Sequence, residues 1–181
     1  ENTVQVPGSG IDIDKFSVMP LPQTKHRIFI FIARLLWDKG LLEYVEAARI
    51  VKRISPNTCF YLVGPIDESD NQSVAHSEVK AWENENLICY LGESNDIRRS
   101  IMGAHCVVLP SYREGLPRVL LEGASMGRPL VATNVPGCRD IVDDSDNGYL
   151  CHVKYLGDKA IWYKDASTLE NILLSFDKEK V

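Results

Sequence analysis

The feature that most constrains this chain is an alternation of short apolar runs with stretches of helical periodicity. Five runs are rich in β-branched and aromatic residues and are apolar on both faces, as are strands buried inside a parallel sheet. They span residues 27–32, 58–63, 87–91, 106–109 and 129–133. Because parallel neighbours need a crossover connection, usually a helix, the alternation predicts an α/β fold.

Helical patterns occupy the intervals between these runs. In the first interval, Leu41, Val45, Ala48 and Val51 fall on one helical face, and residues 55–57 carry a Ser-Pro-Asn stop signal. Further helices are expected at residues 73–83, 96–102, 116–126 and 167–176. We therefore predict a Rossmann-like, doubly wound parallel sheet with helices on both faces, and a single domain covering residues 1–181.

Composition and charge narrow the class of protein. The 181 residues carry a net charge of −5, whereas nucleic-acid binders usually present a basic face, so we expect no nucleic-acid partner. No apolar run approaches the roughly 20 residues that a membrane-spanning helix needs. The five cysteines and four histidines show no spacing typical of a metal site, which indicates buried thiols in a reducing cytoplasm and no metal. The chain starts at Glu1 without a Met or a secretion signal, so we expect a segment of a longer protein.

The loop after the first run carries two cations. In a doubly wound sheet, ligands bind beyond the carboxyl ends of the strands, and this loop places Arg34 and Lys39 there, at the start of a helix. Cations at a helix N-terminus are unfavourable unless an anion joins them, which indicates a bound phosphate. Fixed cations would stabilise a diphosphate leaving group most strongly as its bond breaks. The alternative is that both are ordinary surface cations.

The loop after the fourth run, residues 110–118, leads into the next helix. Gly115 lets a ligand approach the backbone, and Pro117 is expected in the first helical turn. The free amides of that turn, from Gly115, Leu116 and Arg118 onward, would bind phosphate oxygens. The loop is thus a second candidate for a phosphate contact.

Two glutamates accompany this second loop. Glu114 precedes the helix and Glu122 lies inside it, and helical side chains lean towards the N-terminus. Both carboxylates would therefore reach one crevice, where a carboxylate accepts two hydroxyls of a ribose or pyranose. Two alternatives stay open: a glycosidase acid and nucleophile pair, and Glu122 as the ion-pair partner of a nearby arginine.

Three further turns carry weaker signals. Residues 133–140 hold a Pro-Gly turn before a short helix, and we assign this third loop a structural role. Gly10 lies in a glycine-containing turn near the N-terminus, and Gly64 lies in the turn after the second run. We expect both glycines to line the crevice.

Together these residues resemble the donor domain of family-four retaining glycosyltransferases, which have the two-domain GT-B fold. The resemblance keeps the order and spacing of the motifs over most of the chain. It is carried by residues 7–12 with Phe16, 33–34, 39–40, 62–64, 90–92, 110–117, 122, 129–133, 136–137 and 147–150. Residues 109–118 and 136–139 are most similar to bacterial enzymes that extend undecaprenyl-diphosphate-linked sugars with a uridine-linked, galacto-configured donor.

The resemblance implies a role for each matching residue. Arg34, Lys39 and Glu114 would be catalytic, the two cations on the donor diphosphate and the glutamate on the sugar hydroxyls. The donor-binding set would comprise Gly10, Gly64, Tyr90, Leu91, Gly115, Leu116, Pro117, Arg118, Val119 and Glu122. The backbone of Tyr90 and Leu91 would meet the base, and Glu122 the ribose. No cofactor and no metal are implied, because the nucleotide diphosphate sugar is a substrate held by fixed charges.

The same resemblance implies the partners and the setting of the enzyme. It would transfer a hexose or N-acetylhexosamine, with retention, to a glycan or a lipid-linked acceptor at the cytoplasmic membrane face, in capsule or O-antigen synthesis. The parent enzyme would be cytoplasmic or peripheral to the inner membrane. An N-terminal acceptor domain completes the catalytic cleft, and we expect it to be absent from this chain, which would bind donor weakly and transfer little alone.

Two other functions stay open at this stage. The sheet alone would permit a dinucleotide-binding oxidoreductase domain, although no G-x-G-x-x-G follows the first run. A non-catalytic module that binds a partner protein would keep the same fold.

Overall fold

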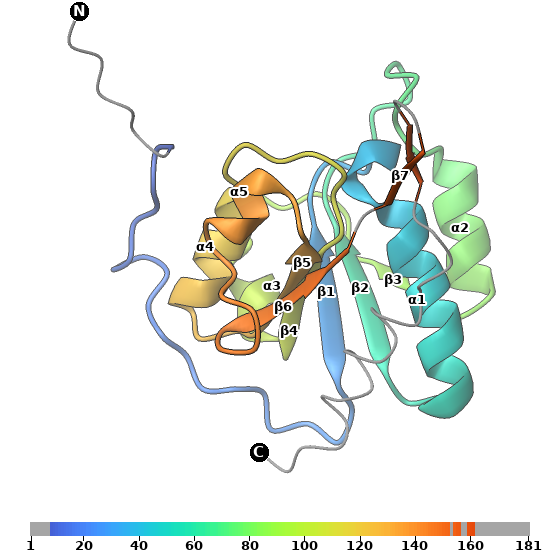
Figure 1. Cartoon of the computed structure of the whole chain (residues 1–181). Coiled ribbons are helices and arrows are strands. Elements are labelled where there is room, and N and C mark those ends of the chain that lie inside the picture. The colour runs from blue at the N-terminus through green and yellow to red at the C-terminus, as the bar shows by residue number, and fades with distance from the viewer. Residues whose placement is uncertain (1–7, 153, 157–158, 162–181) are drawn as a thin grey trace, which may run out of the picture.

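The computed structural model describes residues 8–152, 154–156 and 159–161. Its main feature is a six-stranded parallel sheet with the strand order β3-β2-β1-β4-β5-β6 (Figure 1). The strands are β1 (Ile28–Ile32), β2 (Cys59–Val63), β3 (Cys89–Tyr90), β4 (Cys106–Leu109), β5 (Leu130–Thr133) and β6 (Gly148–Cys151). Two further strands, β7 (Lys154–Leu156) and β8 (Lys159–Ile161), pair with each other antiparallel.

The five predicted strands are all present, each inside its predicted run, which confirms the prediction of a doubly wound α/β sheet. The sequence pattern does not predict β6. This strand lies at the sheet edge and pairs with β5 alone, and Tyr149 and Leu150 are only partly buried. An edge strand of this kind has no apolar run on both faces, so it lacks the signal that marks the central strands.

The connecting helices differ from their predicted ranges mainly at their starts. They are the 3-10 helix η1 (Trp37–Lys39) and the α-helices α1 (Leu41–Ile54), α2 (His76–Asn84), α3 (Arg98–Met102), α4 (Arg118–Ser125) and α5 (Pro136–Arg139). The placement of Pro117 in the first turn of a helix is wrong: its extended ψ of 105° makes it the N-cap, and α4 begins one residue later. The helix predicted at residues 167–176 lies outside the described residues.

Helices cover both faces of the sheet and form two cores (Figure 1). Phe29 and Phe31 of β1 pack into the core beneath α1 and α2, whereas Ile30 and Ile32 pack into the core beneath α3, α4 and α5. Alternate residues of one strand thus serve opposite layers, as the pleat of a strand requires. Burying each large apolar side chain of this kind contributes roughly 1.5–3 kcal/mol.

The segment before β1 runs beside α4 (Figure 1) and is hydrogen-bonded to the last residue of that helix. The Ser125 hydroxyl donates to the carbonyl of Phe16 at 2.6 Å, and the Phe16 ring is buried. Arg128 is only 2% exposed. Its guanidinium donates to four backbone carbonyls, those of Met19, Pro20, Ile101 and Met102. These contacts hold the N-terminal segment against one face of the domain.

The direction of winding reverses between β1 and β4. Chain order runs outward from β1 through β2 to β3, and then from β4 through β5 to β6 in the opposite direction. In open α/β sheets, this switch point leaves a crevice beyond the carboxyl ends of the two central strands. The fold therefore brings the loops after β1 and β4 to the position where a ligand is expected.

Candidate functional site

The loops that follow β1 and β4 are in direct contact at the switch point. Gly40 has a φ of 75° and lies so close to the Pro110 carbonyl that an added Cβ would stand within 3.0 Å of it. The amide of Tyr112 donates to the carbonyl of Asp38 at 2.9 Å. A glycine is required at position 40 both for the left-handed backbone and for this close approach.

Two of the predicted catalytic side chains meet across these loops. Lys39, in η1, donates from Nζ to Oε1 of Glu114 at 2.8 Å, although the two residues are far apart in the sequence. Their side chains are 20% and 13% exposed, so the pair is partly shielded from solvent. A charge-assisted hydrogen bond of this length fixes both groups in the crevice.

Arg34 lies apart from this pair. It is exposed, and within the described residues no hydrogen bond or ion pair involves its side chain. The pKa of Asp67, in the loop after β2, is lowered by hydrogen bonds from Ser69 and, to a smaller extent, by the charge of Arg34. Gly64 lies directly behind it, because an added Cβ would stand within 3.0 Å of the Ala33 carbonyl. The same loop thus presents one paired cation and one cation open to a ligand.

The first turn of α4 presents free amides at this crevice. Pro117 caps the helix without a side-chain hydrogen bond, and the amide of Leu120 donates back to the Pro117 carbonyl at 3.1 Å. Within the part of the chain that the structure describes, the amides of Arg118 and Val119 have no acceptor. Free amides at a helix N-terminus form a site for an anion such as phosphate.

The third loop supports the second one from below. An added Cβ on Gly137 would stand within 3.0 Å of the carbonyls of both Glu114 and Gly115. The Thr133 hydroxyl donates to the carbonyl of Ser111. The structural role predicted for this loop fits these contacts, and sequence reasoning missed only how close to Glu114 it acts.

Glu122 is buried in α4, with 6% of its surface exposed. Burial raises the pKa of its carboxyl group, while the charges of Arg118 and Lys15 lower it. Arg118 stands 3.6 Å away on a side chain that is 63% exposed, and no hydrogen bond reaches the carboxylate from the described residues. The alternative of a structural ion pair therefore describes only a loose contact. The influence of Lys15 was not foreseen, because it depends on how the N-terminal segment crosses α4.

Tyr90 and Leu91, the residues expected near the nucleobase of the donor, already make hydrogen bonds within the domain. The Tyr90 hydroxyl donates to the Gly64 carbonyl at 2.8 Å, and the Tyr90 amide donates to Glu83 at 3.0 Å. The Leu91 amide donates to the Leu62 carbonyl at 2.8 Å, and the Leu91 side chain is 48% exposed. These two amides are therefore committed to the fold, which leaves the exposed Leu91 side chain at the edge of the crevice.

The two glycines of the N-terminal turn have different surroundings. Gly10 has a φ of 65° and nothing within 4 Å of an added Cβ. Gly8, with a φ of 80°, packs against the side chain of Leu116 instead. The space beside Gly10 is therefore open, and its place in the crevice stays a prediction.

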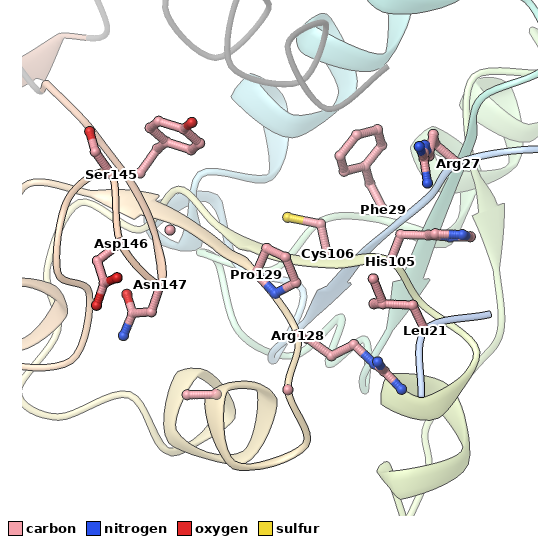
Figure 2. A pocket seen from close by; sticks show the side chains of 14 residues that line it. Leu21, Arg27, Phe29, His105, Cys106, Arg128, Pro129, Ser145, Asp146 and Asn147 are labelled. Carbon is pink, nitrogen blue, oxygen red and sulfur yellow. The ribbon is translucent and has the colours of Figure 1, made fainter. Parts of the chain in front are cut away.

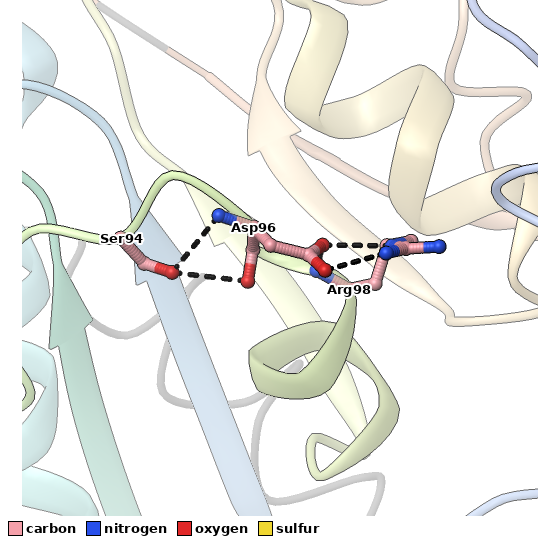
Figure 3. A network of polar contacts seen from close by, with 3 residues as sticks. All are labelled: Ser94, Asp96 and Arg98. Atoms are coloured by element: carbon pink, nitrogen blue, oxygen red, sulfur yellow. Dashed lines mark hydrogen bonds and ion pairs between the residues drawn. The ribbon is translucent and has the colours of Figure 1, made fainter.

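The loop after β3 is braced by a compact polar network (Figure 3). Arg98 donates to both carboxylate oxygens of Asp96, at 2.7 and 2.6 Å, and the Asp96 amide donates to the Ser94 hydroxyl at 3.2 Å. The bidentate contact fixes the entry into α3 beside the exposed end of β3.

A hollow of about 610 Å³ lies at the opposite edge of the sheet, at the amino ends of the strands. Figure 2 shows Ser145, Asp146 and Asn147 on one side of it and Phe29 and His105 on the other. His105 accepts from the Ile28 amide and contacts the Pro22 carbonyl, both at 3.1 Å. Burial lowers the pKa of His105, which agrees with a neutral ring held by the backbone. This hollow is therefore not where the candidate catalytic groups meet.

The described residues offer neither a metal cluster nor a membrane-spanning helix. They contain no group of three or more His, Cys, Asp or Glu side chains arranged to hold a metal ion. None of their helices combines the length and apolar character needed to cross a membrane.

Known proteins share sequence similarity with most of this chain. A family model described as "Glycosyl transferases group 1" matches residues 12–163. The chain is 31% identical to N,N'-diacetylbacillosaminyl-diphospho-undecaprenol alpha-1,3-N-acetylgalactosaminyltransferase of Campylobacter jejuni, over 93% of the chain and 44% of that protein. It is 26% identical to UDP-Gal:alpha-D-GlcNAc-diphosphoundecaprenol alpha-1,3-galactosyltransferase of Escherichia coli, over 81% of the chain and 41% of that protein. The chain thus spans less than half the length of these relatives.

Solved structures share the fold. The HepE protein of Anabaena, crystallised in complex with UDP, superimposes with a TM-score of 0.74 at 23% sequence identity. The match covers 93% of this chain and 46% of that one. At this level of identity, the likeness bears on the fold and not on the ligand.

Proposed function

The chain belongs to the group 1 glycosyl transferases, and from this premise we propose that it is the donor-binding half of a retaining glycosyltransferase. It binds the nucleotide diphosphate of an activated sugar, with UDP as the nucleotide. The complete enzyme transfers a hexose or N-acetylhexosamine from that donor to a lipid-linked glycan. An acceptor-binding domain, N-terminal in the same enzyme, completes the cleft.

The observation that carries the proposal is the convergence of Lys39, Glu114 and the first turn of α4 at the switch point. Breaking the bond between sugar and diphosphate leaves negative charge on the diphosphate. Lys39 and the amides of Arg118 and Val119 are positioned to stabilise that charge, and Arg34 adds a planar guanidinium that binds phosphate with two hydrogen bonds. Because these donors are fixed before the reaction, little reorganisation is needed as charge develops.

The contact between Lys39 and Glu114 suggests how the donor enters. Without ligand, Lys39 donates to Glu114 at 2.8 Å. An incoming diphosphate competes for the ammonium group, and the carboxylate then accepts hydrogen bonds from sugar hydroxyls. The sugar and the diphosphate thus replace one ion pair by two sets of contacts, which couples recognition of the sugar to recognition of the phosphate.

Glu122 suits the ribose. It is buried, its carboxylate accepts no hydrogen bond from the described residues, and it projects from the helix whose N-terminus meets the phosphate. A carboxylate in that setting binds the vicinal hydroxyls of a pentose side by side. Lys15 keeps the buried charge from being fully uncompensated.

The names of the relatives support the nucleotide and the acceptor class. One relative is a galactosyltransferase that uses UDP-Gal, another is an N-acetylgalactosaminyltransferase, and both act on diphospho-undecaprenol carriers. We extend this substrate class to the present enzyme, which would then work at the cytoplasmic face of the membrane in polysaccharide synthesis. Fixed charges and amides, without a metal, hold the donor.

Thermal unfolding with a panel of ligands tests the proposal. The panel is UDP, UDP-galactose, UDP-N-acetylgalactosamine, GDP-mannose and NADH. A ligand present at a hundred times its Kd adds about 2.7 kcal/mol to the free energy of unfolding. The proposal expects stabilisation by UDP and a UDP-sugar and none by NADH. Stabilisation by NADH alone would point to an oxidoreductase domain, and no response to any UDP compound would contradict the proposal.

A further inference from the structure

The loop that carries Glu114 is tied to α1 by a tyrosine. Tyr112, two residues before Glu114, donates its hydroxyl to Oε1 of Glu43 in the first turn of α1. Its amide donates to the Asp38 carbonyl at 2.9 Å. Side chain and backbone of this one residue therefore join the loop after β4 to the segment that carries Lys39.

Glu43 is an unusual partner for this bond. Its second carboxylate oxygen, Oε2, is buried and has no hydrogen-bond partner among the described residues. Burial raises the pKa of the Glu43 carboxyl, and the bond from Tyr112 lowers it. A buried polar atom without a partner is costly, so its retention calls for a physical reason. The helix dipole at the start of α1 reduces the cost but does not supply a second partner.

We propose that Glu43 and Tyr112 form a positioning pair, which holds the Glu114 loop against the Lys39 segment before the donor binds. This inference rests on the proposed function. Neither side chain needs to touch the donor. Their bond sets the separation between Lys39, Glu114 and the amides of α4, and electrostatic binding of a diphosphate depends on such preorganised spacing.

The other contacts of the loop explain why this bond matters. On the far side, the Ser111 carbonyl accepts from Thr133, and Gly137 packs against Gly115. Those contacts anchor the loop to β5 and the third loop. The contact of Lys39 with Glu114 is the one that the ligand must disrupt. Once it is broken, the Glu43–Tyr112 bond is a side-chain contact that still joins the two loops.

The affinity for UDP in matched variants tests the pair. Tyr112→Phe removes only the hydroxyl, and we expect it to raise the Kd for UDP about tenfold, equivalent to ~1.4 kcal/mol. Glu43→Ala should raise it by the same factor, and the double variant no further, because the two changes remove one interaction. Glu43→Gln keeps an acceptor oxygen for the hydroxyl and should restore affinity to within about twofold of the wild type.

Tyr44→Phe is the control for a purely structural effect. The buried Tyr44 hydroxyl donates to the strand carbonyls of Phe29 and Tyr61 at 3.0 and 3.1 Å. Its removal should lower the Tm without changing the Kd for UDP, whereas Tyr112→Phe should change the Kd with little effect on the Tm.

Two results would overturn the inference. One is a Tyr112→Phe variant that binds UDP as tightly as the wild type. The other is a double variant whose loss of affinity is the product of the two single losses. A wild-type protein that binds no UDP would instead contradict the proposed function, and the inference would be lost with it.

Discussion

The amino ends of the central strands, which form the amino edge of the sheet, and their carboxyl ends, which form its carboxyl edge, use polar groups in opposite ways. At the amino edge, Arg128 and His105 border the hollow of about 610 Å³, yet both are engaged by backbone groups. At the carboxyl edge, α4 carries Glu122 and the amides of Arg118 and Val119, which have no hydrogen-bond partner among the described residues. Polar groups without a partner, rather than a hollow, therefore mark the edge at which we propose that the donor binds.

The largest effect should come from breaking the amino edge. Arg128→Met removes four hydrogen bonds to backbone carbonyls, of which the Ile101 carbonyl still accepts from the Ala104 amide. We expect the free energy of unfolding to fall by about 3–5 kcal/mol, measured by urea denaturation, with no change in the Kd for UDP. Arg139→Met is the control, because Arg139 is exposed and its side chain donates to the Asn134 side chain rather than to the backbone carbonyls of the N-terminal segment. A loss of UDP affinity in Arg128→Met would mean that the amino edge takes part in binding.

Removing a cation from the carboxyl edge should have the opposite result: a weaker affinity for UDP with little change in the free energy of unfolding. Lys39→Ala eliminates a donor to the diphosphate, and we expect the binding free energy for UDP to weaken by about 2 kcal/mol, or roughly thirtyfold in Kd. Lys80→Ala serves as the matched control, since Lys80 is 69% exposed and forms an ion pair with Glu83 on α2, away from the loops after β1 and β4. Calorimetric titration measures both, and equal affinities would remove Lys39 from the site.

Adding a methyl group to the third loop, which packs against the Glu114 loop, should lower both the stability of the domain and its affinity for UDP-sugars. Gly137→Ala places a Cβ within 3.0 Å of the carbonyls of Glu114 and Gly115, so the backbone must shift. We expect a stability loss of about 1–3 kcal/mol and a weaker affinity for UDP-sugars. Gly103→Ala, where the nearest atom to an added Cβ is 3.5 Å away, is the control. Unchanged sugar affinity in Gly137→Ala would show that the third loop does not position Glu114.

The smallest effect concerns the pH dependence of stability. Burial raises the pKa of Glu122 above its usual value near 4.5, so the folded state holds this proton more tightly than the unfolded state. The protonated Glu122 carboxyl therefore contributes to the free energy of unfolding fully below the pKa of the unfolded state. This contribution is lost as pH rises through the pKa of the folded state. Glu122→Gln should remove this loss and flatten the stability curve just above pH 4.5 in denaturant titrations. A curve identical to that of the wild type would mean that burial does not shift the pKa of the Glu122 carboxyl group.

The sequence was sufficient to predict most of the fold and part of the candidate site, and the rest could not be predicted for physical reasons. The central strands were predictable because burial on both faces requires apolar runs, and the meeting of Lys39 with Glu114 followed from their places after β1 and β4. Lys15 and the Glu43–Tyr112 bond were not predictable, because they depend on how remote segments pack. The edge strand β6 and the N-cap at Pro117 were missed because local patterns there are ambiguous.

The most direct test of the central claim is to map UDP onto the domain by amide chemical-shift changes in ¹⁵N-labelled protein. The account predicts that the largest changes fall at Lys39, Gly115, Arg118 and Val119, beyond the carboxyl ends of β1 and β4. Changes concentrated at Phe29, His105 and Asn147, around the hollow at the amino edge, would contradict it.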